Sequence, residues 1–202
     1  MDQSVIRAKF GDDYVATEKT YRLGIDVRLT TAIAERFSGL RVLETCTGAG
    51  FTTIALAKVA AHVTSIEIDP EHQSQARKNI NRAGLADKVT FVAGDALSPA
   101  LMSLVNTADS AFLGPDWAVT GPGHRYLFRQ SNMRPPADLL LHSVLTRTPN
   151  IALILPTEVD LGELENLPPH ERQSLYLQGQ HALYCLYFGA LAEKWEPSEL
   201  RA

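Results

Sequence analysis

The stretch that decides the fold is LRVLETCTGAG, Leu40 to Gly50. LRVLETC predicts a buried strand, and TGAG predicts a glycine turn. The next residues, FTTIALAKVA at 51–60, predict a helix. A strand, a tight turn and a helix in this order form the unit from which parallel sheets are built.

The same alternation continues along the chain. Strands are predicted at HVTSIEI (62–68), VTFVA (89–93), SAFL (110–113) and IALIL (151–155), and helices at 69–84, 101–105 and 138–146. RQSLYLQ (172–178) and HALYCLYF (181–188) flank a short turn with a glycine, as in an antiparallel hairpin. The pattern predicts an α/β fold whose parallel sheet is covered by helices on both faces.

Helix ends support this assignment. Asp69 is a predicted N-cap, Pro70 suits the first helical position, and Gly84 suits the C-terminal stop. Residues 1–39 are less regular, with a helix expected at RLTTAIAERF (28–37). We expect an N-terminal helical segment, 1–39, packed on a domain formed by residues 40–202.

Composition limits the classes of function. The 202 residues are 45% hydrophobic and 21% charged, and the net charge is -4, which argues against general nucleic-acid binding. An RNA partner would need a local patch, and residues 118–150 carry four arginines against one aspartate. The two cysteines lack metal or redox spacing, and neither a signal-like block nor a membrane span is evident. We expect a cytoplasmic protein without a metal.

Three predicted strands end in residues suited to a cofactor. Gly48 and Gly50 allow a ligand to approach the backbone after the first strand. Glu67 ends the second strand, where an acid accepts hydrogen bonds from ribose hydroxyls, and Asp95 follows the third, where it can accept from an adenine amine. Because ligands bind at the carboxyl ends of parallel strands, these residues predict an adenosine site.

The type of adenosine cofactor follows from two further residues. The G-x-G-x-x-G fingerprint of dinucleotide sites is incomplete, because Thr53 stands at its third glycine. Glu44 would repel a pyrophosphate but suits the cationic amino-acid end of S-adenosylmethionine. We therefore predict S-adenosylmethionine as the cofactor, and Thr45, Cys46, Ile68 and Ala96 complete the predicted set of contacts.

The chain resembles a known family from about Leu40 to Leu191. The segments VLETCTGAGFTTIALA, IEIDPEHQSQARKNINRAGLADKVTFVAGDA, FLGPDW, LILPTEVDLGELENL and LYCLYFGAL are similar to class I S-adenosylmethionine-dependent methyltransferases, and specifically to the trimethylguanosine synthase (RNA cap guanine-N2 methyltransferase) family. The resemblance implies a Rossmann-like, doubly wound, seven-stranded sheet with the last strand antiparallel. It also implies that Glu44 faces the methionine moiety, Glu67 the ribose and Asp95 the adenine.

FLGPDW (112–117) holds the candidate catalytic residues, Pro115, Asp116 and Trp117. In the family, a polar residue and a proline carbonyl accept hydrogens of the amine, and an aromatic residue stacks on the base. Here Gly114 replaces the polar residue, and Asp116 replaces a second proline. The Gly114 or Pro115 carbonyl would then accept the amine, with the Asp116 carboxylate as second acceptor or proton acceptor. Trp117 would stack on the base, or only cover the sheet.

Three readings of the function stay open. The first is an N-methyltransferase that acts on an exocyclic amine of a guanine-like base, in RNA or in a smaller nucleotide. The second keeps the cofactor and has a small molecule or a protein as acceptor, as the acidic charge favours. The third is a non-catalytic S-adenosylmethionine-binding module, since Gly114 offers no side-chain acceptor.

Overall fold

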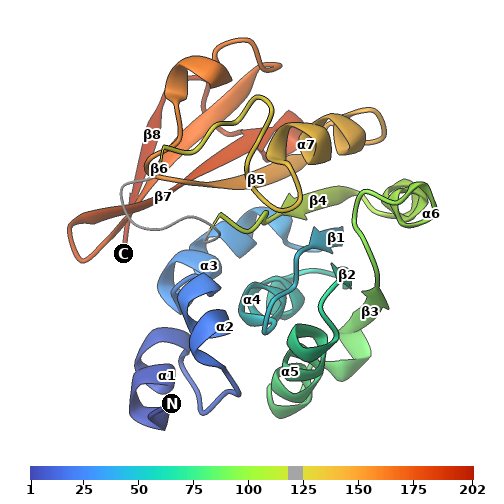
Figure 1. The fold of residues 1–202 in the computed structure, drawn as a ribbon, viewed down its shortest axis with the longest axis vertical. Coiled ribbons are helices and arrows are strands. Elements are labelled where there is room, and N and C mark those ends of the chain that lie inside the picture. The colour runs from blue at the N-terminus through green and yellow to red at the C-terminus, as the bar shows by residue number, and fades with distance from the viewer. Residues whose placement is uncertain (118–124) are drawn as a thin grey trace.

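The computed structural model describes residues 1–117 and 125–202. The described residues form one eight-stranded sheet with the order β3-β2-β1-β4-β5-β7-β6-β8 (Figure 1). The strands are β1 (Arg41–Thr45), β2 (His62–Glu67), β3 (Val89–Ala93), β4 (Ser110–Leu113), β5 (Ile151–Pro156), β6 (His170–Leu177), β7 (Gln180–Phe188) and β8 (Ser198–Arg201). The α-helices are α1 (Gln3–Phe10), α2 (Glu18–Leu23), α3 (Val27–Ala34), α4 (Phe51–Val59), α5 (Pro70–Arg82), α6 (Pro99–Met102) and α7 (Ala137–Leu145). Short 3-10 segments are η1 (Glu35–Phe37), η2 (Ala86–Lys88), η3 (Ser103–Thr107), η4 (Leu161–Leu164) and η5 (Gly189–Leu191).

The α/β class and the mostly parallel sheet are confirmed. Strands β1 to β5 run parallel, and β7 is antiparallel to both β5 and β6. The predicted hairpin forms, and its turn residues Gln178 and Gly179 both have positive φ, as a two-residue turn between antiparallel strands prefers. The predicted helix start is also present: the Asp69 side chain accepts from the Glu71 and His72 amides, and Pro70 is the first helical residue.

The predicted number of strands needs correction. The sheet has eight strands rather than seven, because β8 pairs parallel to β6 at the edge. The last of the seven predicted strands, β7, is antiparallel as predicted and lies inside the sheet, between β5 and β6. The sequence SELR is short and charged, so it carries no strand pattern of its own. It forms a strand because it covers the otherwise unpaired backbone edge of β6.

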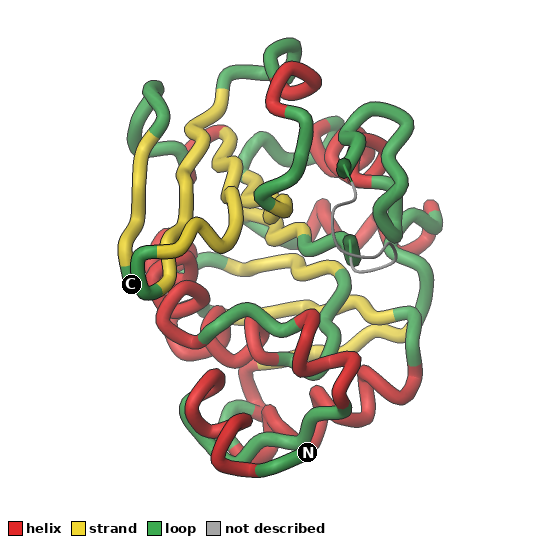
Figure 2. Tube along the Cα trace, turned by 60° about the vertical axis from the view of Figure 1, so that its left-hand side comes forward, coloured by secondary structure: helices red, strands yellow, loops and turns green. Residues whose placement is uncertain are grey.

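Helices cover both faces of the sheet (Figure 2). On one face, Val42 and Val63 pack with residues of α3 and α4. On the other, Leu43 and Ile66 pack with α6, η3 and α7. Neighbouring residues of one strand therefore enter opposite core layers, which explains the nearly continuous apolar runs in the sequence.

The N-terminal helices pack against α4 and α5 (Figure 1). The Phe10 ring of α1 stacks on the Phe51 ring with centroids 3.5 Å apart. A Cβ atom at Gly24 would lie 2.7 Å from atoms of both rings, so this close approach requires glycine. Asn79 of α5 accepts from the Val15 amide at 2.6 Å and donates to its carbonyl at 2.9 Å. No helix in the described parts of the chain has the length and apolar character needed to cross a bilayer.

Candidate active site

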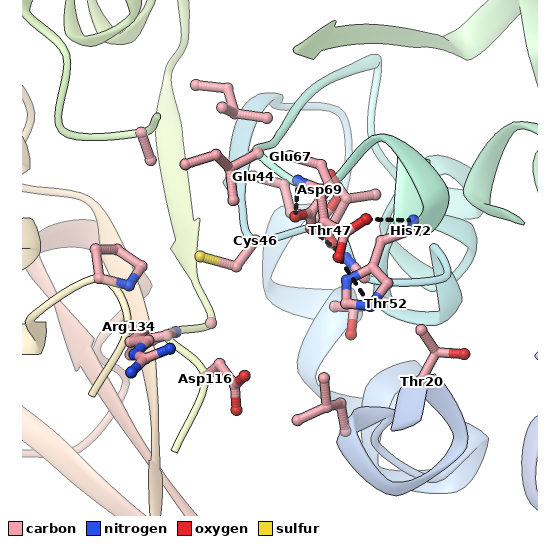
Figure 3. A pocket seen from close by; sticks show the side chains of 18 of the residues that line it. Thr20, Glu44, Cys46, Thr47, Thr52, Glu67, Asp69, His72, Asp116 and Arg134 are labelled. Carbon is pink, nitrogen blue, oxygen red and sulfur yellow. Dashed lines mark hydrogen bonds and ion pairs between the residues drawn. The ribbon is translucent and has the colours of Figure 1, made fainter. Parts of the chain in front are cut away.

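A cavity of about 460 Å³ opens at the carboxyl ends of the parallel strands (Figure 3). The end of β2 and the loops after β1, β2, β3 and β4 line it with residues 46–49, 66–69, 94–97 and 114–117. Residues 19–20, 23–25 and 134–136 line further parts of its wall. Both the volume and the place are typical of a small-molecule or cofactor site in an open parallel sheet.

The cavity brings together ten of the twelve predicted site residues: Glu44, Cys46, Gly48, Glu67, Ile68, Asp95, Ala96, Pro115, Asp116 and Trp117. Thr45 and Gly50 do not line it. Thr45 is fully buried within β1. Gly50 has a φ of 82°, and a Cβ atom there would lie 3.0 Å from the Ala76 Cβ, so it permits α4 to start close to α5. Both residues therefore shape the turn rather than face the cavity.

Glu44 is a buried carboxylate at the cavity wall, with 1% of its surface exposed. Its Oε2 accepts from the Thr53 hydroxyl and from the Ser65 hydroxyl, each at 2.6 Å. Burial raises the pKa of Glu44 to about 7; the two hydroxyl bonds oppose this rise, and the nearby Glu67 adds to it. A cationic group bound nearby would favour the ionised form of this carboxylate.

Glu67 connects two loops of the site. Its Oε2 accepts from the Gly48 amide at 2.8 Å, and its Oε1 accepts from the Asp69 amide at 2.9 Å. Because an ionised carboxylate has about four acceptor positions, each oxygen keeps capacity for a ligand hydroxyl. The residue thus both shapes the cavity and offers acceptors to it.

Asp95, in the loop after β3, is the predicted adenine contact, and Ile68 is a further predicted cofactor contact. The Asp95 carboxylate accepts from the Leu97 amide at 2.8 Å, which fixes the loop. Ile68 is 68% exposed and lines the cavity, an unusual position for a large apolar side chain. A cavity lined by both an apolar side chain and an acid suits a flat, partly polar ligand such as a purine base.

Cys46 lines the cavity in a left-handed conformation, with a φ of 62°. Burial, together with the charge of Glu67, raises the pKa of its thiol above the ordinary range. Because the nucleophilic form of cysteine is the thiolate, this environment disfavours a nucleophilic role for Cys46.

The GPDW segment forms the facing wall. Figure 3 shows Asp116 and Arg134 on one side of the cavity and Glu67, Asp69 and His72 on the other. The Asp116 amide donates to the Arg134 carbonyl at 2.8 Å, and the Arg134 amide donates back at 2.9 Å. The Asp116 carbonyl is therefore engaged, whereas no backbone amide of the described residues donates to the Gly114 or Pro115 carbonyl. Trp117 packs at the border of both core layers and also lines the cavity.

Sequence reasoning missed part of the wall. Its members are Lys19, Thr20, Leu23, Gly24 and Ile25 from the N-terminal segment, Thr52 and His72 from the first turns of α4 and α5, and Arg134, Pro135 and Pro136. The two helix starts carried a usable signal, because first turns that follow parallel strands face the ligand side. The residues of the N-terminal segment and residues 134–136 reach the cavity through tertiary packing, which no local sequence pattern predicts.

The predicted basic patch is reduced by pairing. Arg125 forms an ion pair with Asp160, and Arg134 lines the cavity. Arg129 and Arg147 are exposed. Residues 118–124, which belong to the same predicted patch, lie outside the described residues.

Comparison with known proteins decides the family. Residues 40–190 match the RNA cap guanine-N2 methyltransferase family. The chain belongs to this family. The resemblance seen in the sequence is confirmed. For the family to which the chain belongs, the predicted methyltransferase class and the predicted cofactor, S-adenosylmethionine, are confirmed as well.

Other relatives share the fold or one segment with this family member. A protein-L-isoaspartate O-methyltransferase from Hyperthermus butylicus is 38% identical over 79 residues, which are 34% of this chain and 33% of the relative. The match thus spans a third of that relative's length. A structure from Porphyromonas gingivalis W83, assigned as a methyltransferase, aligns with a TM-score of 0.77 at 19% identity. The alignment covers 93% of this chain and 47% of the Porphyromonas chain. An RNA methyltransferase structure from Salinibacter ruber, in complex with S-adenosyl-L-homocysteine, aligns with a TM-score of 0.53 at 22% identity. The alignment covers 89% of this chain and 95% of the Salinibacter chain.

Proposed function

We propose that this protein transfers a methyl group from S-adenosylmethionine to an exocyclic amine of a guanine-like base, in RNA or in a smaller nucleotide. The observation that carries the proposal is the cavity itself. Its lining combines predicted cofactor residues at the ends of β1, β2 and β3 with the GPDW segment, and Figure 3 shows Glu67 across the cavity from Asp116. Membership of the RNA cap guanine-N2 methyltransferase family supports the same reaction.

The residues present fit the cofactor. The Glu67 carboxylate has acceptor capacity for ribose hydroxyls, and Ile68 and Asp95 offer an apolar surface and an acceptor for the adenine. Glu44 is a buried carboxylate suited to the cationic end of the methionine part. When bound, the cofactor would supply a methyl group on a sulfonium, from which a neutral thioether leaves as a nitrogen lone pair attacks the methyl carbon.

On the acceptor side, the protein must hold the amine in line with the methyl group and accept its hydrogens. The Gly114 and Pro115 carbonyls are the backbone acceptors for this role, and the Asp116 carboxylate accepts the proton released after transfer. Trp117 stacks on the base, and its indole would bind a cationic, already methylated guanine especially well.

A small-molecule or protein acceptor is the second candidate. The pairing of Arg125 with Asp160 leaves less cationic surface for RNA, and the net charge is -4. Binding of an RNA acceptor to the protein would weaken as the salt concentration rises, whereas binding of a small uncharged acceptor would not.

Transfer of a labelled methyl group tests the function. We expect label from S-adenosylmethionine in the RNA or nucleotide fraction of an extract, and about tenfold or greater loss of cofactor affinity in Glu67→Gln, because a charged acceptor for the ribose is lost. Glu196→Ala, which removes an exposed acid outside the cavity lining, is the matched control. Label in proteins or small molecules would instead support the second candidate, a small-molecule or protein acceptor. Cofactor binding without any methyl transfer would favour a non-catalytic module.

Cofactor affinity is expected to depend on pH through Glu44. Its pKa of about 7 in the free protein means that Glu44 is largely protonated below pH 7. A cationic ligand favours the carboxylate, so binding releases this proton, and affinity rises with pH up to about 7 and then levels off. Calorimetric titrations between pH 6 and pH 8 should show a rise of about tenfold. The rise should vanish in Glu44→Gln; an equal rise in that variant would contradict this origin.

A further inference from the structure

We infer that Lys19, on helix α2, binds the carboxylate of the cofactor's methionine part. The inference rests on the cofactor part of the proposed function and adds a contact from a segment outside the residues that match the family. Its basis is the position of Lys19 in the cavity wall, the charges around it and the polar groups opposite it.

Helix α2 is held firmly at the cavity. The Thr20 hydroxyl donates to Gln75 Oε1 of α5 at 2.8 Å, and Thr20 is only 1% exposed. Val15, shortly before this helix, is bonded through both backbone groups to Asn79 of α5. The backbone of Lys19 is therefore fixed beside the cavity, whereas its side chain is 62% exposed and has room to turn.

The charges of the cavity require a cation for the cofactor. Among the described lining residues, Lys and Arg are represented by Lys19 and Arg134, against the carboxylates of Glu44, Glu67, Asp69, Asp95 and Asp116. The carboxylates suit the ammonium and sulfonium groups of S-adenosylmethionine, but its own carboxylate needs a positive partner. Figure 3 shows Arg134 beside Asp116 on the acceptor wall, and Thr20 of α2 on the other side of the cavity. Lys19 precedes Thr20 in α2 and is therefore the cation placed for the cofactor.

The groups near Lys19 are suited to an anion. Figure 3 shows Thr20 of α2 on the same side as Thr52 and His72. Thr52 lies in the first turn of α4, and no hydrogen bond of its hydroxyl is found within the described residues. The N-cap of α4 is Gly50, which supplies no side-chain cap. Uncapped amides and a hydroxyl with spare capacity favour a carboxylate at this point.

Lys19 is held only weakly by its ion-pair partner. Its Nζ lies 3.8 Å from Asp69 Oδ2, a long contact between partly exposed groups. Such exposed pairs contribute little to stability. A move of the ammonium from Asp69 to a cofactor carboxylate therefore costs little.

Calorimetric titration with two ligands tests the inference. S-adenosylhomocysteine carries the amino-acid group, and 5′-methylthioadenosine has the same adenosine and thioether without it. We expect Lys19→Gln to weaken S-adenosylhomocysteine binding about tenfold, or about 1.4 kcal/mol, and to leave 5′-methylthioadenosine binding unchanged. Lys19→Arg should retain most of the affinity. Lys78→Gln, which removes an exposed cation of α5 outside the cavity, should change neither.

The outcomes separate the inference from the proposed function. Equal losses of affinity for both ligands, or no loss for either, would overturn the role of Lys19 without contradicting the assignment of the cofactor. Failure of the wild type to bind either ligand would overturn the cofactor, and this inference with it. Release of Asp69 in the variant cannot imitate the expected result, because a freed carboxylate would attract the ligand's ammonium and raise affinity.

Discussion

Replacing Asp116 with alanine is expected to slow methyl transfer by about 10²- to 10⁴-fold, the usual contribution of a positioned proton acceptor, with cofactor affinity unchanged. The expected loss follows from the departure of this chain from its family. Gly114 has no side chain to accept a hydrogen of the amine, so the carboxylate of Asp116 is the side-chain acceptor that GPDW offers for that role.

The substitution should leave the wall intact. The two hydrogen bonds that hold residue 116 to residue 134 are made by backbone atoms, which alanine retains. Single-turnover rates with saturating cofactor, compared with calorimetric affinities, therefore separate a chemical defect from a binding defect. Asp116→Asn keeps an oxygen acceptor without the charge. A transfer rate between those of wild type and Asp116→Ala would show how much of the loss comes from positioning the amine and how much from accepting the proton.

A compensating change makes the test sharper. A Cβ atom at Gly114 would meet Phe112 Cε1 at 3.5 Å and the Thr45 carbonyl at 3.7 Å, which are ordinary contacts. Gly114→Asn restores the polar residue of the family pattern and should recover part of the rate lost in Asp116→Ala. Transfer by Asp116→Ala at the wild-type rate would exclude the carboxylate from the chemistry.

Those features of the fold that depend on local chemistry could be predicted. The apolar strand, glycine turn and helix of residues 40–60 predicted the first repeat, and Asp69 and Pro70 marked the start of α5. The acids at the ends of β1, β2 and β3 were predicted as one site because parallel strands bring their carboxyl ends to one edge, and the cavity contains all three.

Features that depend on distant packing could not be predicted. Strand β8 exists because β6 offers an open edge, and its own four residues have no strand pattern. Lys19 and Thr20 reach the cavity because α2 and the residues before it are bonded to α5, through pairs that lie 55 and 64 residues apart in the chain. Thr45 was predicted as a cofactor contact, but its side chain is fully buried in β1 and does not line the cavity.

Removing the charge of Arg36 is expected to lower the free energy of unfolding by about 3–5 kcal/mol, the usual cost of leaving a buried partner charge alone. Arg36 of η1 donates to both carboxylate oxygens of Glu171, at 2.7 and 3.1 Å, and Glu171 is fully buried in β6. Glu171 also accepts from the Ser198 hydroxyl at 2.6 Å and the Glu193 amide at 2.8 Å. The cluster thus fastens the start of β8 and the preceding loop to β6 and η1.

The pH dependence identifies the source of this loss. Burial alone would raise the pKa of Glu171, but the bonds from Arg36, Ser198 and the Glu193 amide outweigh it and hold the pKa at about 2, against 4.5 ordinarily. Because the folded pKa is lowered, the stabilisation is present above about pH 4.5 and is lost as pH falls toward 2. Without Arg36, burial raises the pKa of Glu171 in the variant, so the difference between wild type and Arg36→Met, measured by urea unfolding, should be largest at pH 7 and shrink steadily as pH falls toward 2.

The double variant Arg36→Met, Glu171→Gln completes the cycle. It removes the uncompensated charge, and the amide oxygen of the introduced glutamine can still accept from Ser198, so much of the stability lost in Arg36→Met should return. Arg36 lies outside the cavity lining, and we expect cofactor affinity at 25 °C to remain at the wild-type value in every folded variant. A constant deficit of Arg36→Met from pH 7 to pH 3 would instead assign the loss to packing against Tyr187, whose ring centroid lies 3.8 Å from the guanidinium carbon.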